Sequence, residues 1–185
     1  MIHLLKIEWL KLRKYRGFLI LLGFSVLGIL GINYIVYSVN DMVKAASSVD
    51  PTAAALGQAM MGTPFSFPEV WQTVTYISSF MLVIPGILII LLMANEYTFK
   101  THRQNVIDGL GRTGFITGKL LLMAGLALGF TLLVFITALL FGLFGGTPLS
   151  FTNIKYIGLF FVQAISFMSV GLVLVMLVKR AGIAI

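Results

Sequence analysis

Four long intervals of this 185-residue chain contain no aspartate, glutamate, lysine or arginine. Each is long enough for a membrane-spanning helix, which needs about 20 apolar residues. Only 10% of all residues are charged, whereas a soluble domain carries roughly 25%. A soluble core of this size could not bury so much apolar surface. The sequence therefore predicts an all-α polytopic membrane protein, a single transmembrane domain with spans at 17–37, 70–94, 120–144 and 154–178.

The longest interval lies between Lys119 and Lys155, and a turn signal divides it. Gly145, Gly146, Thr147 and Pro148 follow one another, and such a run is typical of a turn and not of a helix interior. We therefore predict that a short turn joins the third and fourth spans.

Lysine and arginine are distributed unevenly between the connecting segments. Residues 1–16 hold five of them, 95–119 hold four, and two follow residue 178, eleven together, whereas the remaining segments hold only Lys44 and Lys155. Basic loops stay in the cytoplasm. The count predicts a multi-pass protein of the cytoplasmic membrane with the N-terminus and 95–119 inside and 38–69 as an outer loop.

The first 16 residues have the pattern of a helix that lies in the membrane interface. Apolar side chains recur on one face at helical spacing, with basic residues elsewhere; the apolar residues are Ile2, Leu5, Trp9 and Leu12. A simple cytoplasmic extension of the first span is the alternative. A cleavable signal peptide is disfavoured because no small-residue cleavage site follows the basic segment.

Aromatic residues gather around the start of the second span, at Phe65, Phe67 and Trp71. Aromatics beside a span usually lie at the headgroup level, so we expect them to anchor the chain there. Contact with a ligand is the alternative.

Within the spans, three residues indicate helix packing or bending. Pro85 removes a backbone donor and predicts a kink, which could mark a pathway-lining helix or be an ordinary membrane proline. Gly125 and Gly129 form a Gly-x-x-x-Gly pair that lets another helix approach closely. No acidic or basic residue lies inside the four intervals, which argues against transport driven by a proton relay.

Motifs of catalysis and of metal binding are not supported. Cysteine is absent, and His3 and His102 have no evident ligand partners, so we expect no metal site. The Gly-x-Gly-x-x-Gly run at 109–114 does not follow a strand, and the Gly-Lys pair at 118–119 lacks the other residues of a phosphate-binding loop. We expect a chain that is not itself an enzyme and does not bind nucleic acid.

The polar segment 95–119 predicts a short helix over 102–108. Thr101 and Gln104 have the spacing of a capping box. An apolar edge follows, formed by Val106, Ile107 and Leu110, and Gly109 ends the element. A helix this short is marginal alone, so it would gain most by docking onto a partner or onto lipid headgroups.

These features together resemble the permease subunit of a bacterial type-2 ABC exporter. The resemblance rests on the amphipathic start, on Glu96 and Tyr97 closing the second span, and on a Thr-, Arg-, Gln-, Asn- and Gly-rich loop ending in Gly118 and Lys119. It covers the whole chain in topology but is specific only over 95–119.

The resemblance implies a role for each of these segments. Residues 1–16 would be an elbow helix, and 101–111 a coupling helix held by a separate ATP-binding subunit, which would bind ATP and Mg²⁺. The implied coupling residues are Glu96, Thr101, His102, Arg103, Gln104, Asn105, Val106, Ile107, Asp108 and Gly109. A second permease copy or homologue would complete a dimer in the bacterial inner membrane, and this chain would itself bind no cofactor.

Permeases of this kind have six spans and this chain has four, so we expect a fragment of a longer protein. The alternative is a four-helix scaffold or assembly protein whose basic face binds lipid or a partner. A channel is a further alternative, although no ring of charges is apparent. The sequence pattern indicates neither which substrate is transported nor whether the dimer contains two identical chains.

Overall fold

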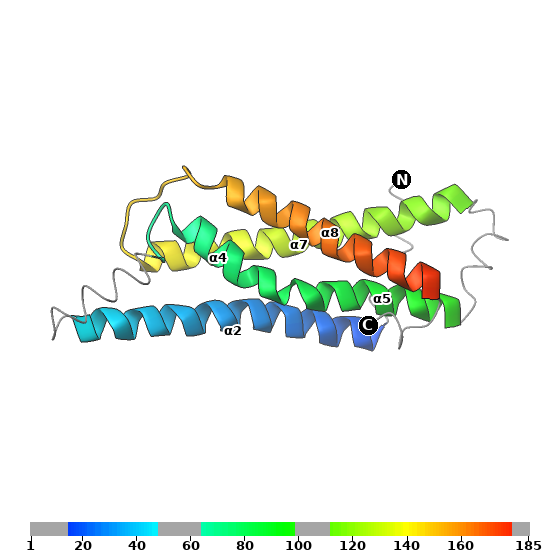
Figure 1. Ribbon diagram of the computed structural model, residues 1–185, viewed down its shortest axis with the longest axis horizontal. Coiled ribbons are helices and arrows are strands. Elements are labelled where there is room, and N and C mark those ends of the chain that lie inside the picture. Colours follow the sequence, from blue (N-terminus) through cyan, green and yellow to red (C-terminus); the bar gives the residue numbers. More distant parts are fainter. Residues whose placement is uncertain (1–14, 48–63, 99–111, 179–185) are drawn as a thin grey trace. The chain divides into compact units, whose positions relative to one another are not determined.

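The computed structural model describes residues 15–47, 64–98 and 112–178. Every regular element in these ranges is a helix (Figure 1). In chain order they are α2 (Arg16–Ser47), α4 (Val70–Ser79), the 3₁₀-helix η1 (Phe80–Leu82), α5 (Val83–Thr98), α7 (Arg112–Phe144) and α8 (Lys155–Val178).

Four helical stretches are long and apolar enough to cross a membrane, which confirms the predicted all-α membrane fold. Their bounds are Arg16–Ala45, Val70–Thr98, Thr113–Phe144 and Lys155–Leu177. The second combines α4, η1 and α5 into one span. Over an apolar stretch of 18 residues in each span, 44% of the residues are buried in the second span, against 17% in the first and 33% in each of the other two. The second span is therefore the one most enclosed by protein.

Several helices extend beyond the predicted spans. α2 continues through Ser47, well past residue 37, α5 ends at Thr98, and α7 begins at Arg112. Hydropathy measures the apolar length that lipid requires, whereas a helix can continue through polar residues outside the hydrocarbon. The flanks of 95–119 are consequently helical. The predicted short helix, with the coupling residues Thr101 to Gly109, lies outside the described residues, as does the predicted interfacial helix with Ile2, Leu5, Trp9 and Leu12.

The chain divides into two compact units. Unit 1 comprises Met1–Ser25, Met81–Phe130 and Phe161–Ile185, and unit 2 comprises Val26–Phe80 and Thr131–Phe160. The helices α2, α7 and α8 contribute to both units, whereas α5 belongs to unit 1 and α4 to unit 2.

In unit 1, α5 contacts three other helices. Phe18 of α2, Leu88 of α5 and Leu122 of α7 form one buried apolar cluster. On another side, a Cβ added at Gly171 of α8 would lie 3.1 Å from the carbonyl oxygen of Gly86. Two helices can approach this closely only because small residues face each other. The close approach lies at this pair, whereas no atom lies within 4 Å of a Cβ added at Gly125 or Gly129.

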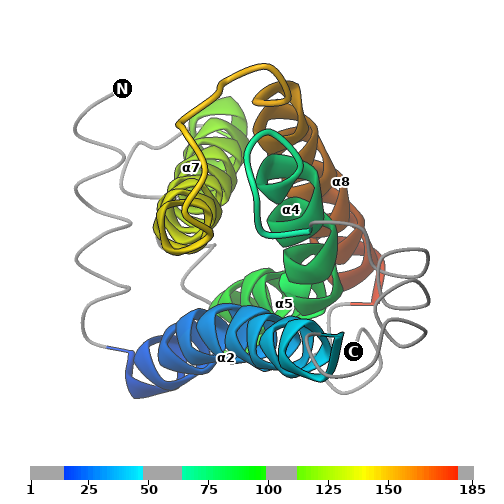
Figure 2. The same ribbon diagram turned by 90° about the vertical axis from the view of Figure 1, so that its left-hand side faces the viewer.

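In unit 2, α4 lies between α7 and α8 (Figure 2). The Trp71 ring stacks on Phe135 of α7 at 5.5 Å and on Phe151 at 6.0 Å between centroids. The indole Nε1–H of Trp71 donates to the carbonyl oxygen of Ser150 at 2.7 Å. Aromatic pairs of this kind stabilise by about 0.5–1.5 kcal/mol beyond the area that they bury.

The aromatic residues expected to anchor the chain among headgroups are buried against protein, and their depth in the membrane stays a prediction. Trp71 is fully buried, Phe65 is 1% exposed and Phe67 is 7% exposed. Phe65 also packs on Tyr37 of α2. Sequence alone cannot distinguish an aromatic residue that meets headgroups from one that meets protein, because both surroundings accept an apolar ring with a polar edge.

The predicted turn between the last two spans is confirmed. α7 ends at Phe144, and Gly146 has a φ of 71°, which favours glycine. The hydroxyl of Thr147 accepts a hydrogen bond from the backbone N–H of Phe67 at 2.8 Å. The turn is thereby tied to the segment that precedes α4.

Candidate functional site

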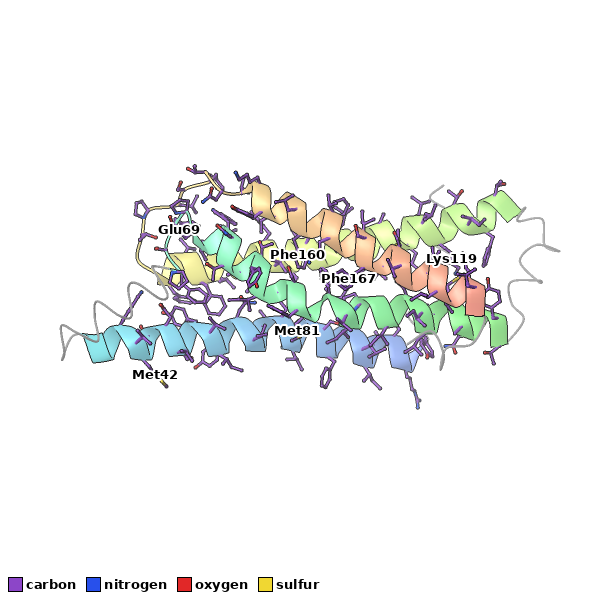
Figure 3. All side chains as sticks on the ribbon, viewed as in Figure 1. Met42, Glu69, Met81, Lys119, Phe160 and Phe167 are labelled. Atoms are coloured by element: carbon purple, nitrogen blue, oxygen red, sulfur yellow. The ribbon has the colours of Figure 1, made fainter. Side chains whose placement is uncertain are left out.

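Glu96 of α5 and Lys119 of α7 form a buried ion pair within unit 1. The Lys119 Nζ lies 2.6 Å from the Glu96 Oε1, and the Lys119 and Glu96 side chains are 4% and 11% exposed, respectively. Figure 3 marks Lys119 on α7. The pair therefore joins the two helices that border residues 99–111, the centre of the predicted coupling segment.

Each partner lies in phase with the apolar stripe of its own helix. On α5, Glu96 follows the buried Ile89 and Met93 at helical spacing. On α7, Lys119 precedes the buried Met123 and Ala127 at the same spacing. The two helices thus turn a carboxylate and an ammonium group inward where apolar residues would otherwise continue the stripe.

The ring of Phe115, which lies near Lys119, packs against an apolar cluster. Ile90, Met93, Ala94 and Val175 form a buried cluster, and Tyr97, Phe115 and Met176 pack against it. The Phe115 ring centroid lies 5.4 Å from the Lys119 Nζ, within the range of a cation–π interaction. Removing one partner of a buried ion pair typically costs about 3–5 kcal/mol of stability.

Glu96 was among the predicted coupling residues, whereas Lys119 entered the prediction as a basic loop residue and as the end of the loop that carries the resemblance. Both were placed just outside the charge-free intervals, but both lie inside helices that qualify as spans. The missed signal was phase: a lysine in register with Met123 and Ala127 is on the inward face. A glutamate in register with the buried stripe of α5 is its natural partner.

Asn33 of α2 is a second polar residue that the sequence pattern did not indicate. It is fully buried in unit 2, and its Nδ2 donates to the Ile29 carbonyl at 2.8 Å and to the Ser78 hydroxyl at 3.0 Å. Its Oδ1 is buried with no hydrogen-bond partner among the described residues. The side chain joins α2 to α4 immediately before η1.

The residues predicted to bend or pack the spans lie on α5 and α7. Pro85 lies near the start of α5 and is buried. Gly125 and Gly129 are on an exposed face of α7, so their predicted packing partner is not found within the described chain and their role stays a prediction.

The sequence profile of the ABC-2 family transporter proteins matches residues 4–183. This chain belongs to that family. The match confirms the resemblance to a type-2 ABC permease, and the protein is the permease component of an ABC transporter. No curated protein and no solved structure shows significant similarity to the chain.

Membership of the ABC-2 family gives the ion pair a context. The protein is a multi-pass transport component, and its family implies an ATP-binding partner in general. Glu96 and Lys119 lie near the two ends of the segment 95–119 that was predicted to bind such a partner.

Proposed function

We propose that this ABC-2 permease exports a substrate outward, driven by ATP hydrolysis in a separate subunit that docks on the 95–119 segment. The N-terminus and this segment face the cytoplasm, ATP and Mg²⁺ bind to the partner, and two permease copies form the working unit. The observation that supports this most directly is the ion pair of 2.6 Å between Glu96 and Lys119. The pair joins α5 to α7, the helices that precede and follow residues 99–111. The two ends of that segment are therefore attached to helices that contact each other.

The charge pattern supports a protein partner more than a lipid surface. Anionic lipid is bound by clusters of lysine and arginine. Of the four basic residues of 95–119, Lys119 is buried in the ion pair, and the other three are separated by threonine, glutamine, asparagine and glycine, which suit a shaped contact. The segment therefore has the composition of a docking element.

Co-purification tests the proposal. The full chain, expressed in its native host with an affinity tag and extracted in a mild detergent, should bring down a protein that binds and hydrolyses ATP. The hydrolysis should be sensitive to vanadate. Recovery of the permease with no nucleotide-binding protein, in several detergents and after cross-linking, would contradict the proposal.

Two substitutions in the docking segment should uncouple the complex. Arg103→Glu reverses a charge, and Ile107→Asp places a charge on the predicted apolar edge. We expect both to reduce recovery of the ATP-binding protein, or the ATP hydrolysis that accompanies it, while the permease is still inserted. The control is Lys155→Glu, which reverses a charge at the start of α8, on the side of the membrane predicted to face away from the partner. Full recovery and hydrolysis in both docking variants would remove the assignment.

A further inference from the structure

The Glu96–Lys119 pair is placed unequally with respect to its two helices. Glu96 lies in the last turn of α5, which ends at Thr98, whereas Lys119 lies two turns into α7, which begins at Arg112. At 1.5 Å per residue, α7 extends roughly 10 Å on the N-terminal side of the pair. The pair is thus a polar contact between α5 and α7 close to residues 99–111.

Stability alone gives a weak reason for this pair. Removing two charges from water is costly, and well-packed apolar side chains often replace a buried pair with no loss of stability. The neighbouring Met93, Ala94 and Val175 show that this region accepts apolar side chains. An ion pair adds a preference for one separation, because the attraction between a carboxylate and an ammonium group at 2.6 Å weakens as they move apart, whereas apolar surfaces can slide past each other.

From this geometry we propose that Glu96 and Lys119 are positioning residues that fix the separation of α5 and α7 at the base of the docking segment. A displacement of residues 99–111 by the partner is then transmitted to both helices together. The role in coupling rests on the proposed function, whereas the fixed separation is a property of this chain alone.

Two exposed positions allow the separation to be measured directly. The chain has no cysteine, so Thr98→Cys with Thr113→Cys gives one pair of spin labels in each copy of the chain, on α5 and α7, and mixing with unlabelled chain isolates the distance within one copy. With the ion pair intact, we expect a narrow distance distribution. In the neutral double variant Glu96→Gln with Lys119→Met we expect it to broaden, and in the reversed variant Glu96→Lys with Lys119→Glu to become narrow again.

The control is Lys155→Met in the same labelled background, which removes an exposed lysine and should leave the distribution unchanged. If Glu96→Gln with Lys119→Met is not recovered from the membrane, Glu96→Asp keeps the charge and withdraws the carboxylate, and it should broaden the distribution too. A neutral double variant, or Glu96→Asp, with the parent distribution would overturn the inference.

The same labels in the complex with the ATP-binding subunit test coupling. Trapping with ATP and vanadate should shift part of the parent population to a second distance. In the neutral double variant we expect the ratio of shifted to unshifted molecules to fall roughly fivefold or more, the lower end of typical coupling. An unchanged ratio would overturn the coupling role. If the parent chain formed no complex, the proposed function would be wrong. The distances measured in the chain alone would still test whether the ion pair fixes the separation of α5 and α7.

Discussion

At Gly145 the backbone that follows α7 meets the carbonyl oxygen of Phe65. A Cβ added to Gly145 would collide with that oxygen and would lie 3.2 Å from the carbonyl oxygen of Gly142. Both obstacles are backbone atoms, which cannot rotate away as a side chain can. The glycine therefore permits the close contact between the 145–148 turn and the segment before α4.

Gly145→Ala should destabilise the protein by about 1–3 kcal/mol, the usual cost of overpacking a filled site. We expect a lower midpoint of thermal unfolding in detergent. The matched control is Gly158→Ala on an exposed face of α8, where a Cβ meets no atom within 4 Å. That change should leave the midpoint unchanged or raise it, because alanine is the better helix former. Equal midpoints for the two variants would contradict the steric argument.

At Asn33, the cost of burying an amide is set against the hydrogen bonds that the amide makes. A buried amide in an apolar span is costly unless its hydrogen bonds are made, and membrane interhelical hydrogen bonds contribute only about 0.6 kcal/mol on average. Its Nδ2 is satisfied by Ile29 and Ser78, but its Oδ1 is not satisfied within the described residues.

Asn33→Leu should therefore leave the unfolding midpoint within a small margin of the parent, since it removes both the bond and the buried acceptor. Ser78→Ala removes only the hydroxyl that accepts from Asn33 and keeps the buried amide, so it should lower the midpoint more than Asn33→Leu does. The reverse order in thermal unfolding would contradict this account.

At the scale of elements, the second span is interrupted where its backbone changes from α-helix to 3₁₀-helix. η1 occupies Phe80–Leu82, and Pro85 follows in the first turn of α5. Proline has no N–H to donate to the carbonyl of Met81, and its ring crowds that carbonyl. The interruption therefore lies N-terminal to the proline that causes it, as is usual for a kinked helix.

Pro85→Ala should restore the missing hydrogen bond and slow amide exchange over residues 80–86, measured by hydrogen–deuterium exchange in detergent. Pro148→Ala, which changes a proline outside the helices, should leave exchange over 80–86 unaltered. If exchange in that segment were the same in the Pro85 variant and the parent, the interruption would have another cause.

At the scale of the whole molecule, the distribution of charge predicts orientation. Eleven lysine and arginine residues lie in segments assigned to one side of the membrane and two to the other. Because basic loops are retained in the cytoplasm, this imbalance favours one insertion over its inverse. The same orientation would present residues 99–111 to a soluble ATP-binding subunit.

Single-cysteine labelling measures the orientation. Glu69→Cys and Thr113→Cys are both exposed positions in a chain without native cysteine. A membrane-impermeant maleimide applied to intact cells should label Cys at 69 and not at 113, and permeabilised cells should label both. Labelling at 113 from outside would invert the topology and remove the proposed docking surface from the cytoplasm.

Local features of the chain were enough to establish the membrane class, the four spans, the turn at 145–148 and the family resemblance. These follow from apolar length, charge and turn residues, which act locally and need no knowledge of contacts. Hydropathy, however, cannot tell a lipid neighbour from a protein neighbour, since both are apolar. Only the tertiary structure therefore shows that Trp71 is enclosed by protein, that Gly171 lies against Gly86, and that Lys119 pairs with Glu96.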